Sequence, residues 1–271
     1  MYQYDKIKGE YPITHWFQPI YQIKESNVFG YEALLRDASH ATVPPIEIFR
    51  EAGKKGHMNI LDRISIKTAV ECYQDEGNTL FLNIFPSTLL ENGFLSWWDQ
   101  NVAHKGNIVL ELLENEPIND WELLKNVTGE LQKRGVKIAV DDMGIGYSFF
   151  QQWIELDPDF IKLDRYFAED LSTCDRKQKT LSSLVELLSD STDLIIEGIE
   201  KKEDLAAAES LGINYAQGYL LGMPSPLDDF LYVSENQSTK QTVPKSSKTA
   251  GEIPPEAESF IQASSGEPSG Y

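Results

Sequence analysis

Short apolar runs alternate with longer amphipathic segments along residues 1–233 of the chain. Runs of four to eight β-favouring residues predict strands, and segments in which apolar residues recur every three or four positions predict helices. Strands are expected at 16–23, 28–35, 80–83, 108–112, 137–141, 160–163, 194–196 and 215–220. Helices are expected between most of them, at 46–54, 60–75, 121–134, 178–188 and 202–211.

This alternation predicts an α/β fold, specifically a TIM-like (β/α)₈ barrel. The first two strands depart from the regular pattern, because only residues 24–27 separate them. A parallel crossover needs about a dozen residues or more. The first pair is therefore expected to form an antiparallel hairpin, and the remaining strands are expected to be parallel.

The composition changes near Leu231, and residues 234–271 are rich in Ser, Pro, Glu, Thr and Lys. Such a segment buries too little apolar surface to offset the entropy of ordering it. The sequence thus predicts one domain over residues 1–233 and a disordered tail over 234–271. The tail is either an inert solvated end or a segment that binds a partner or serves as a linker.

The charge and the cysteines exclude several classes of protein. Lys and Arg number 24 against 43 Asp and Glu, giving a net charge of −19, and a basic stripe for duplex nucleic acid is not visible. The two cysteines, Cys72 and Cys174, form neither a zinc motif nor a disulfide framework. The polar start and the lack of an 18-residue apolar run predict a cytoplasmic protein without a membrane span.

Polar residues follow, or end, most of the predicted strands. In a TIM barrel the carboxyl ends of the strands form one face, where the chemistry is carried out. Burying an unpaired charge costs several kcal/mol, so a series of such strand ends indicates a site. The residues concerned are Asn83, Glu111, Asp141, Asp142, Lys162, Asp164, Glu197, Glu200 and Gln217.

The residue types at these ends suit Mg²⁺ or Mn²⁺, because both cations prefer carboxylate and carbonyl oxygens. One or two such ions would bind a phosphate and activate water. Taken alone, an Asp at a strand end such as Asp142 or Asp164 is more often a helix N-cap than a ligand. Lys162 either pairs with a neighbouring acid or orients the nucleophile. Residues 141–146, DDMGIG, are expected to form a glycine-containing loop beside the site.

The ordered set of motifs resembles the EAL family of bacterial cyclic-di-GMP phosphodiesterases. The resemblance spans roughly residues 15–226 and rests on FQPI at 17–20, YEALLR at 31–36, Asn83, ELLE at 111–114, DD at 141–142, KLD at 162–164, EGIE at 197–200 and QGYL at 217–220. It implies a TIM-like barrel with one antiparallel strand, hydrolysis of cyclic-di-GMP to linear pGpG, and use of Mg²⁺ or Mn²⁺. It also implies a homodimer.

The resemblance assigns roles to thirteen residues. Those that it implies as metal ligands are Glu32, Asn83, Glu111, Asp141 and Asp142. Those that it implies for catalysis are Lys162, which positions the attacking water, Glu197, Gln217, and Glu114, which holds the catalytic loop. Those that it implies for substrate binding are Gln18, Leu34, Arg36 and Asp164.

Four positions depart from the usual family pattern. Met143 and Ile145 replace Phe and Thr in the DDFGTG loop, Lys201 replaces a Thr, and Met223 replaces an Arg. The retained acids, Asn and Lys favour an active cyclic-di-GMP phosphodiesterase. The altered loop leaves open a domain that binds cyclic-di-GMP, or a protein partner, without turnover. A barrel phosphoesterase with another substrate is the third alternative.

Overall fold

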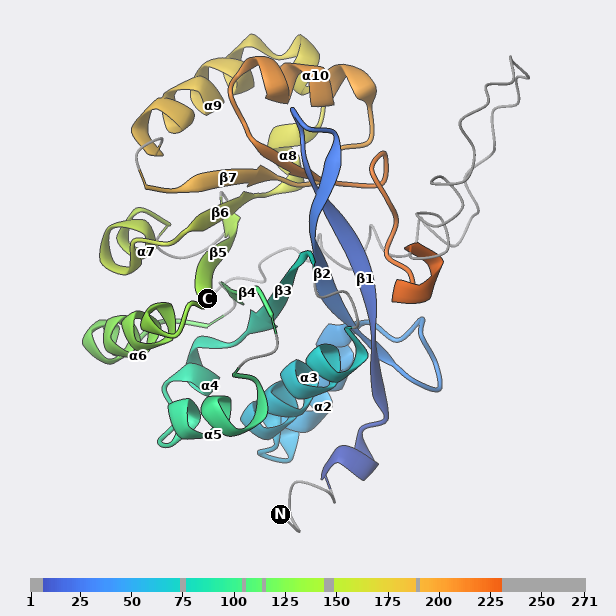
Figure 1. Ribbon diagram of the computed structural model, residues 1–271, viewed down its shortest axis with the longest axis vertical. Helices are drawn as coiled ribbons and strands as arrows, with labels where there is room; N and C mark the ends of the chain where they lie inside the picture. Colours follow the sequence, from blue (N-terminus) through green and yellow to red (C-terminus); the bar gives the residue numbers. More distant parts are fainter. Residues whose placement is uncertain are drawn as a thin grey trace, which may run out of the picture. The chain divides into compact units, whose positions relative to one another are not determined.

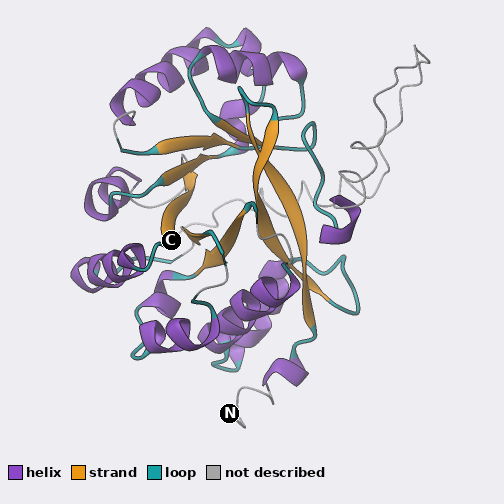
Figure 2. Ribbon diagram, in the orientation of Figure 1, coloured by secondary structure: helices purple, strands orange, loops and turns teal. Residues whose placement is uncertain are grey.

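The structure is a computed structural model that describes residues 7–73, 77–103, 106–113, 116–143, 149–188 and 191–230, without the side chains of residues 142–152. The described residues form a closed barrel of eight strands, in the order in which they follow along the chain, with helices around its outside (Figures 1 and 2). The strands are β1 (Ile13–Gln22), β2 (Asn27–Asp37), β3 (Thr79–Ile84), β4 (Ile108–Leu112), β5 (Lys137–Met143), β6 (Phe160–Leu163), β7 (Asp193–Ile196) and β8 (Tyr215–Gln217).

One strand of the barrel runs against the others. β1 pairs antiparallel with β2 through a short turn, and it closes the barrel by pairing antiparallel with β8. The pairs from β2 to β8 are parallel. The predicted fold, a TIM-like barrel with one antiparallel strand, is confirmed.

Helices lie outside the barrel, as the amphipathic segments predict. α2 and α3 lie beside β1 to β3, whereas α9 and α10 lie beside β6 to β8 (Figure 1). The predicted helices are present with ends shifted by up to three residues, as α2 (Pro45–Lys54), α3 (Met58–Cys72), α6 (Trp121–Lys133), α9 (Asp175–Leu188) and α10 (Lys202–Ser210). The sequence did not predict α4 (Pro86–Leu89), α5 (Phe94–Asn101), α7 (Phe149–Leu156), α8 (Arg165–Ala168) or the 3₁₀ turn η1 (Leu171–Thr173).

The last strand is shorter than predicted, because it ends at Gln217 and not at Leu220. Gly218 follows the strand end, where the chain passes close to Ile199: a Cβ added to Gly218 would lie 2.2 Å from the Ile199 carbonyl oxygen. The backbone then turns, and the Leu220 N–H donates to that same carbonyl at 3.0 Å. The prediction that β8 continues past Gln217 was therefore wrong, and Gln217 lies at the strand end.

An apolar layer fills the interior of the barrel. It is a cluster of buried residues from six strands, and Phe29 and Tyr215 pack against it from the remaining two. Gly30 leaves room for it, because a Cβ there would lie 3.1 Å from the Phe81 ring and 2.4 Å from the Thr79 carbonyl oxygen. We call the cluster the apolar layer; its members are Ile20, Phe81, Val109, Ala139, Phe160 and Ile195.

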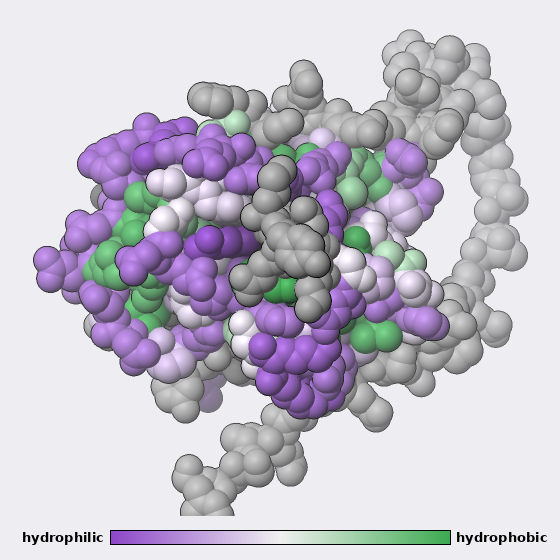
Figure 3. Space-filling view, turned by 90° about the horizontal axis from the view of Figure 1, so that it is seen from below, coloured by the Kyte–Doolittle hydropathy of each residue, from purple (hydrophilic) through white to green (hydrophobic). Residues whose placement is uncertain are grey.

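The outer surface agrees with the acidic composition. Hydrophilic residues cover most of the coloured face in Figure 3, with hydrophobic groups between them. Within the described ranges, none of the helices combines the length and the apolar character needed to cross a bilayer. Residues 231–271 lie outside the description, so the predicted domain boundary and the disordered tail stay predictions.

Candidate active site

The polar side chains of the site lie next to the apolar layer, toward the carboxyl ends of most of the strands. Successive residues of a strand point to opposite faces, so a residue two positions further faces the same way. Two positions from Phe81, Phe160 and Ile195, toward the carboxyl ends, are Asn83, Lys162 and Glu197. We call the resulting set the polar layer; its members are Gln18, Glu32, Asn83, Glu111, Asp141, Lys162, Glu197 and Gln217.

The Lys162 ammonium lies at the centre of the polar layer. This side chain is 1% exposed, and its Nζ lies 3.1 Å from Glu32 Oε2, 3.1 Å from Glu111 Oε2, 3.5 Å from Asp141 Oδ1 and 2.6 Å from Glu197 Oε1. Burial lowers the pKa of Lys162, but the four carboxylates outweigh burial and raise this pKa well above its ordinary value. Lys162 is therefore positively charged and acts as a donor.

Glu32 accepts hydrogen bonds from three strands. Asn83 Nδ2 donates to its Oε1 at 2.9 Å, and Gln217 Nε2 and Lys162 Nζ donate to its Oε2 at 2.8 and 3.1 Å. Burial raises the pKa of Glu32, but Lys162 and these hydrogen bonds outweigh burial, and the net pKa is lowered. Gln18, opposite Glu32 in the hairpin, accepts from Gln217 Nε2 at 3.1 Å.

Glu111 has one carboxylate oxygen without a hydrogen-bond partner among the described residues. It is fully buried, and its pKa is raised well above the usual range by burial, which the charge of Lys162 offsets only in part. Its Oε2 accepts from Lys162, whereas its Oε1 is buried without a hydrogen-bond partner among the described residues. The buried Oε1 of Gln217 likewise accepts no hydrogen bond from any described residue.

The two aspartates of the DD motif occupy an irregularity in β5. Val140 pairs with Ile161 and Met143 with Leu163, so β5 has one more residue than β6 between these pairs. Such bulges re-aim side chains and occur often beside active sites. Asp141 contacts Lys162, whereas the side chain of Asp142 lies outside the description.

The residues of the polar layer suit a hard divalent cation. They supply carboxylate and amide oxygens, and the unpaired Glu111 Oε1 is an acceptor that a cation would satisfy. The arrangement is centred on Lys162, and among the described residues no three His, Cys, Asp or Glu side chains already surround a common metal position. The five predicted metal ligands therefore stay a prediction, which rests on their residue types and on their positions at the strand ends.

Comparison with known proteins identifies the family. The model of the EAL domain matches residues 12–224, which is most of the chain. The chain belongs to the EAL domain family. The predicted resemblance is thereby confirmed.

Two curated relatives of this EAL domain come from Escherichia coli K12. The cyclic di-GMP phosphodiesterase PdeL is 26% identical over 229 residues, which cover 80% of this chain and 63% of PdeL. The probable cyclic di-GMP phosphodiesterase PdeA is 27% identical over 177 residues, covering 64% of this chain and 24% of PdeA. The chain thus spans less than two thirds of the length of either relative.

Solved structures of BlrP1 from Klebsiella pneumoniae share the fold of this EAL domain. Its complex with calcium and cyclic-di-GMP matches with a TM-score of 0.71 and 26% identity, over 79% of this chain and 56% of BlrP1. A manganese and cyclic-di-GMP complex of the same protein matches with a TM-score of 0.71 and 25% identity, over the same shares.

The residues predicted to bind substrate lie at different places around the polar layer of the EAL domain. Gln18 belongs to it, whereas Arg36 lies further along β2, with its guanidinium 5.0 Å above the Trp16 ring. Leu34 pairs with Trp16 across the hairpin. Asp164 caps α8 by accepting from the Tyr166 N–H at 2.8 Å, so the N-cap explanation of this residue is observed. Glu114 and Ile145 lie outside the described residues.

Two acids near the polar layer, Asp62 and Glu116, were not predicted from the sequence. Asp62 is 2% exposed and lies on α3 between the buried Leu61 and Ile64. An acid among the apolar positions of an amphipathic helix is a signal that the sequence carries. Glu116, two residues after the ELLE motif, carries no comparable signal.

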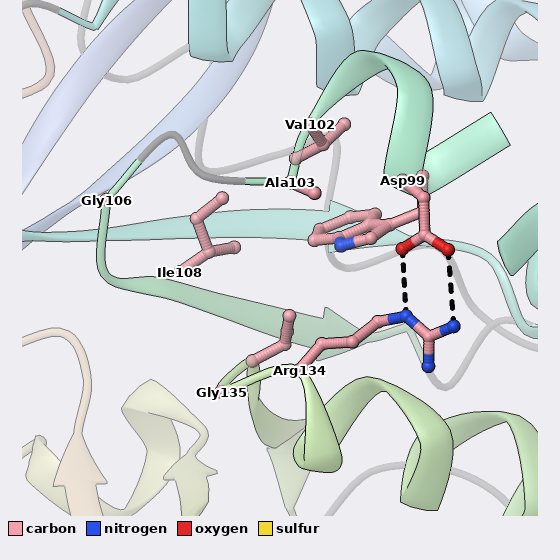
Figure 4. Close-up of a pocket in the computed structure, with 9 residues that line it drawn as sticks. Asp99, Val102, Ala103, Gly106, Ile108, Arg134 and Gly135 are labelled. Carbon is pink, nitrogen blue, oxygen red and sulfur yellow. Dashed lines mark hydrogen bonds and ion pairs between the residues drawn. The ribbon is translucent and has the colours of Figure 1, made fainter. Parts of the chain in front are cut away.

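A pocket of about 220 Å³ lies at the opposite end of the barrel. Ile108, at the start of β4, and Val136, just before β5, belong to its lining. Asp99 and Arg134 face each other at one side of this pocket, where Nε and Nη2 of Arg134 donate to Asp99 at 2.8 and 3.2 Å (Figure 4). Since the guanidinium is already paired, this pocket is not a ready anion site.

Proposed function

We propose that this EAL domain hydrolyses cyclic-di-GMP to linear pGpG with the help of a divalent cation. The polar layer is the observation that carries the proposal, because it gathers acids, amides and a buried lysine at the carboxyl ends of the strands. The relatives support the choice of substrate, since PdeL is named a cyclic di-GMP phosphodiesterase and BlrP1 is described with cyclic-di-GMP bound.

The proposed cation is Mg²⁺ or Mn²⁺, as one or two ions. Glu32, Asn83, Glu111 and Asp141 would hold it, with Asp142 from the same bulge of β5. A divalent cation bound there would polarise a phosphodiester oxygen and lower the pKa of a neighbouring water. The calcium and manganese complexes of BlrP1 support a divalent cation without selecting one.

The roles that we propose for the other residues follow from their protonation and contacts. Lys162 stays protonated, so it donates to a water or to developing negative charge and does not serve as the base. Glu197, with 21% of its side chain exposed, is the acid of the Lys162 cluster most accessible to a reacting water, and we assign proton acceptance to it. Gln217 Oε1 would accept from the same water.

Arg36 is the residue that we propose for the substrate phosphate. It is buried, its Nη1 donates to the Leu35 carbonyl at 2.8 Å, and its Nε has no partner among the described residues. The Trp16 ring, whose centroid lies 5.0 Å from the guanidinium carbon, provides a cation–π contact for Arg36 near the carboxyl end of β2. A planar guanidinium of this kind suits a phosphate oxygen, and Gln18, Leu34 and Asp164 would complete the substrate surface.

Turnover of cyclic-di-GMP tests this function directly. Wild type with Mg²⁺ or Mn²⁺ should release pGpG, and Glu32→Ala should not, because Glu32 connects three strands of the layer. Asp99→Ala, at the opposite end of the barrel, is the control and should retain wild-type turnover. Equal rates for wild type and Glu32→Ala would reject the proposal.

A second candidate function is binding of cyclic-di-GMP or of a protein without turnover. It is favoured by the ammonium of Lys162, which lies among the acids that a cation would need. Tight nucleotide binding together with undetectable pGpG in either metal would support this receptor function. A homodimer, a cytoplasmic location and a partner for residues 234–271 remain further proposals that the resemblance and the composition suggest.

A further inference from the structure

A set of side chains outside the polar layer holds the turn that follows β3. Phe85 is the N-cap residue of α4, and residues 86 and 87 begin the helix, for which none of the described side chains forms the usual N-cap hydrogen bond. The first backbone N–H groups of a helix otherwise lack partners. Acids from two other segments of the chain supply them here.

Asp62, on α3, supplies the first of these partners. Its Oδ2 accepts from the Phe85 N–H at 3.0 Å, while the side chain is 2% exposed on the inner face of α3. Three residues earlier on the same helix, Asn59 Oδ1 lies 3.2 Å from the Ser87 hydroxyl. One face of α3 therefore contacts both ends of the turn.

Glu116 supplies the second partner from the segment after β4. Its Oε2 accepts from the Ser87 N–H at 3.0 Å, and its Oε1 accepts from the Ser87 hydroxyl at 3.1 Å. A backbone hydrogen bond from Leu113 N–H to the Ile84 carbonyl, at 3.2 Å, joins the same two segments. Glu116 thus ties the turn after β3 to the segment after β4.

These two segments follow residues of the polar layer within a few positions along the chain. Asn83 and Glu111 are direct partners in the β3–β4 register. The contacts of Asp62 begin two residues after Asn83, and those of Glu116 lie five residues after Glu111. A shift of either segment would change the separation of an amide and a carboxylate that both face the proposed cation.

We propose that Glu116 and Asp62 are positioning residues, which fix Asn83 relative to Glu111 for cation binding. This inference rests on the proposed function. Outer groups that orient metal ligands typically contribute about 10- to 100-fold to metal affinity. A merely structural role would lower the stability of the fold and leave the affinity of the folded protein unchanged.

The test measures the affinity for Mn²⁺ alone, from the free-ion signal in electron paramagnetic resonance, on folded full-length protein. Glu116→Ala and Asp62→Ala should each weaken Mn²⁺ binding about tenfold. Asp99→Ala is the matched control, because Asp99 also accepts two hydrogen bonds, but at the other end of the barrel. It should bind Mn²⁺ within about twofold of wild type, since it orients none of the proposed ligands.

Conservative variants separate positioning from loss of fold. In Glu116→Gln, Oε1 can accept from the Ser87 N–H while Nε2 donates to the Ser87 hydroxyl, so binding should recover to within about threefold of wild type. If Glu116→Ala does not fold, Ser87→Ala removes one of the same contacts and should still weaken binding. Melting temperatures are recorded for every variant.

The outcomes separate the two proposals. If folded Glu116→Ala and Ser87→Ala bind Mn²⁺ as tightly as wild type does, the positioning role is overturned and the proposed function is left intact. Wild-type protein that neither binds Mn²⁺ nor releases pGpG would overturn the proposed function and this inference with it.

Discussion

The apolar and polar layers of the barrel use the same strands and the same inward face, two residues apart. In the apolar layer, burial of Phe81, Phe160 and their neighbours away from water stabilises the folded state. In the polar layer, burial raises the free energy of each charge, and the contacts of Lys162 with four carboxylates offset part of that cost. The comparison shows that strand periodicity sets where a side chain points, while residue type decides whether the position stabilises the fold or serves chemistry.

Lys162→Met should have the largest effect, because it removes the positive charge around which the acids are arranged. We expect turnover of cyclic-di-GMP to fall about 10²- to 10³-fold, as for loss of a donor to developing charge. Steady-state rates of pGpG formation measure this. Lys125→Met is the matched control, since Lys125 is 60% exposed on α6; equal losses in both variants would contradict the role of the polar layer.

Phe160→Ala should break the apolar layer and spare the polar one. Removing a fully buried aromatic side chain should lower the free energy of unfolding by about 3–5 kcal/mol. Chemical denaturation measures that loss, and turnover per folded molecule should stay within a few fold of wild type. Phe160→Leu should lose much less stability. A Phe160→Ala protein that keeps wild-type stability would show that the interior does not depend on this packing.

Asp62 shows how burial changes the pKa of an acid that has no lysine ammonium among the described residues close to it. Burial raises its pKa to about 7, whereas Lys162 holds the pKa of Glu32 below its usual value. Folded protein therefore keeps the Asp62 proton up to about pH 7, while unfolded protein loses it near pH 3.8, so this group lowers the stability as pH rises between these values.

Asp62→Asn should remove that pH dependence, because the amide oxygen still accepts from the Phe85 N–H. The wild-type unfolding free energy should fall relative to the variant by up to about 4 kcal/mol between pH 4 and pH 8, at about 1.4 kcal/mol per pH unit. Denaturation curves at several pH values measure the difference. Parallel pH profiles for the two proteins would contradict the shifted pKa.

Gly198→Ala should have the smallest effect of this series. Gly198 follows Glu197 with φ +71°, and a Cβ there would lie 2.4 Å from the Cβ of Arg165. We expect a loss of about 1–3 kcal/mol in unfolding free energy, from strain at this backbone conformation. Gly129→Ala on α6 is the control with the opposite sign: within 4 Å of its added Cβ the described structure places nothing, so it should gain about 0.5–1 kcal/mol.

Much of the fold followed from local patterns in the sequence. The apolar runs predicted all eight strands of the described barrel, and the short connection at residues 24–27 predicted the antiparallel hairpin. The short helices α4 and α8 were missed because four residues show no helical period. The early end of β8 was missed because it depends on the distant Ile199 carbonyl, which lies against Gly218.

The site was predictable to the extent that it lies at strand ends. Asn83, Glu111, Lys162 and Gln217 are polar residues in or at the end of apolar runs, which marked them as site candidates, and the structure brings them together. The arrangement of the acids around Lys162 depends on three-dimensional distances, which the spacing of residues along the sequence does not give. The hydrogen bonds of Asp62 and Glu116 likewise join segments more than twenty residues apart.

The rate of pGpG formation from cyclic-di-GMP is the most direct test of the central claim that the polar layer is a metal-assisted phosphodiesterase site. Wild-type protein with Mn²⁺ should release pGpG, and both chelation of the metal and Glu32→Ala should abolish release. Undetectable pGpG from wild type in Mg²⁺ and in Mn²⁺ at mildly alkaline pH, with Glu32→Ala indistinguishable from it, would contradict the claim.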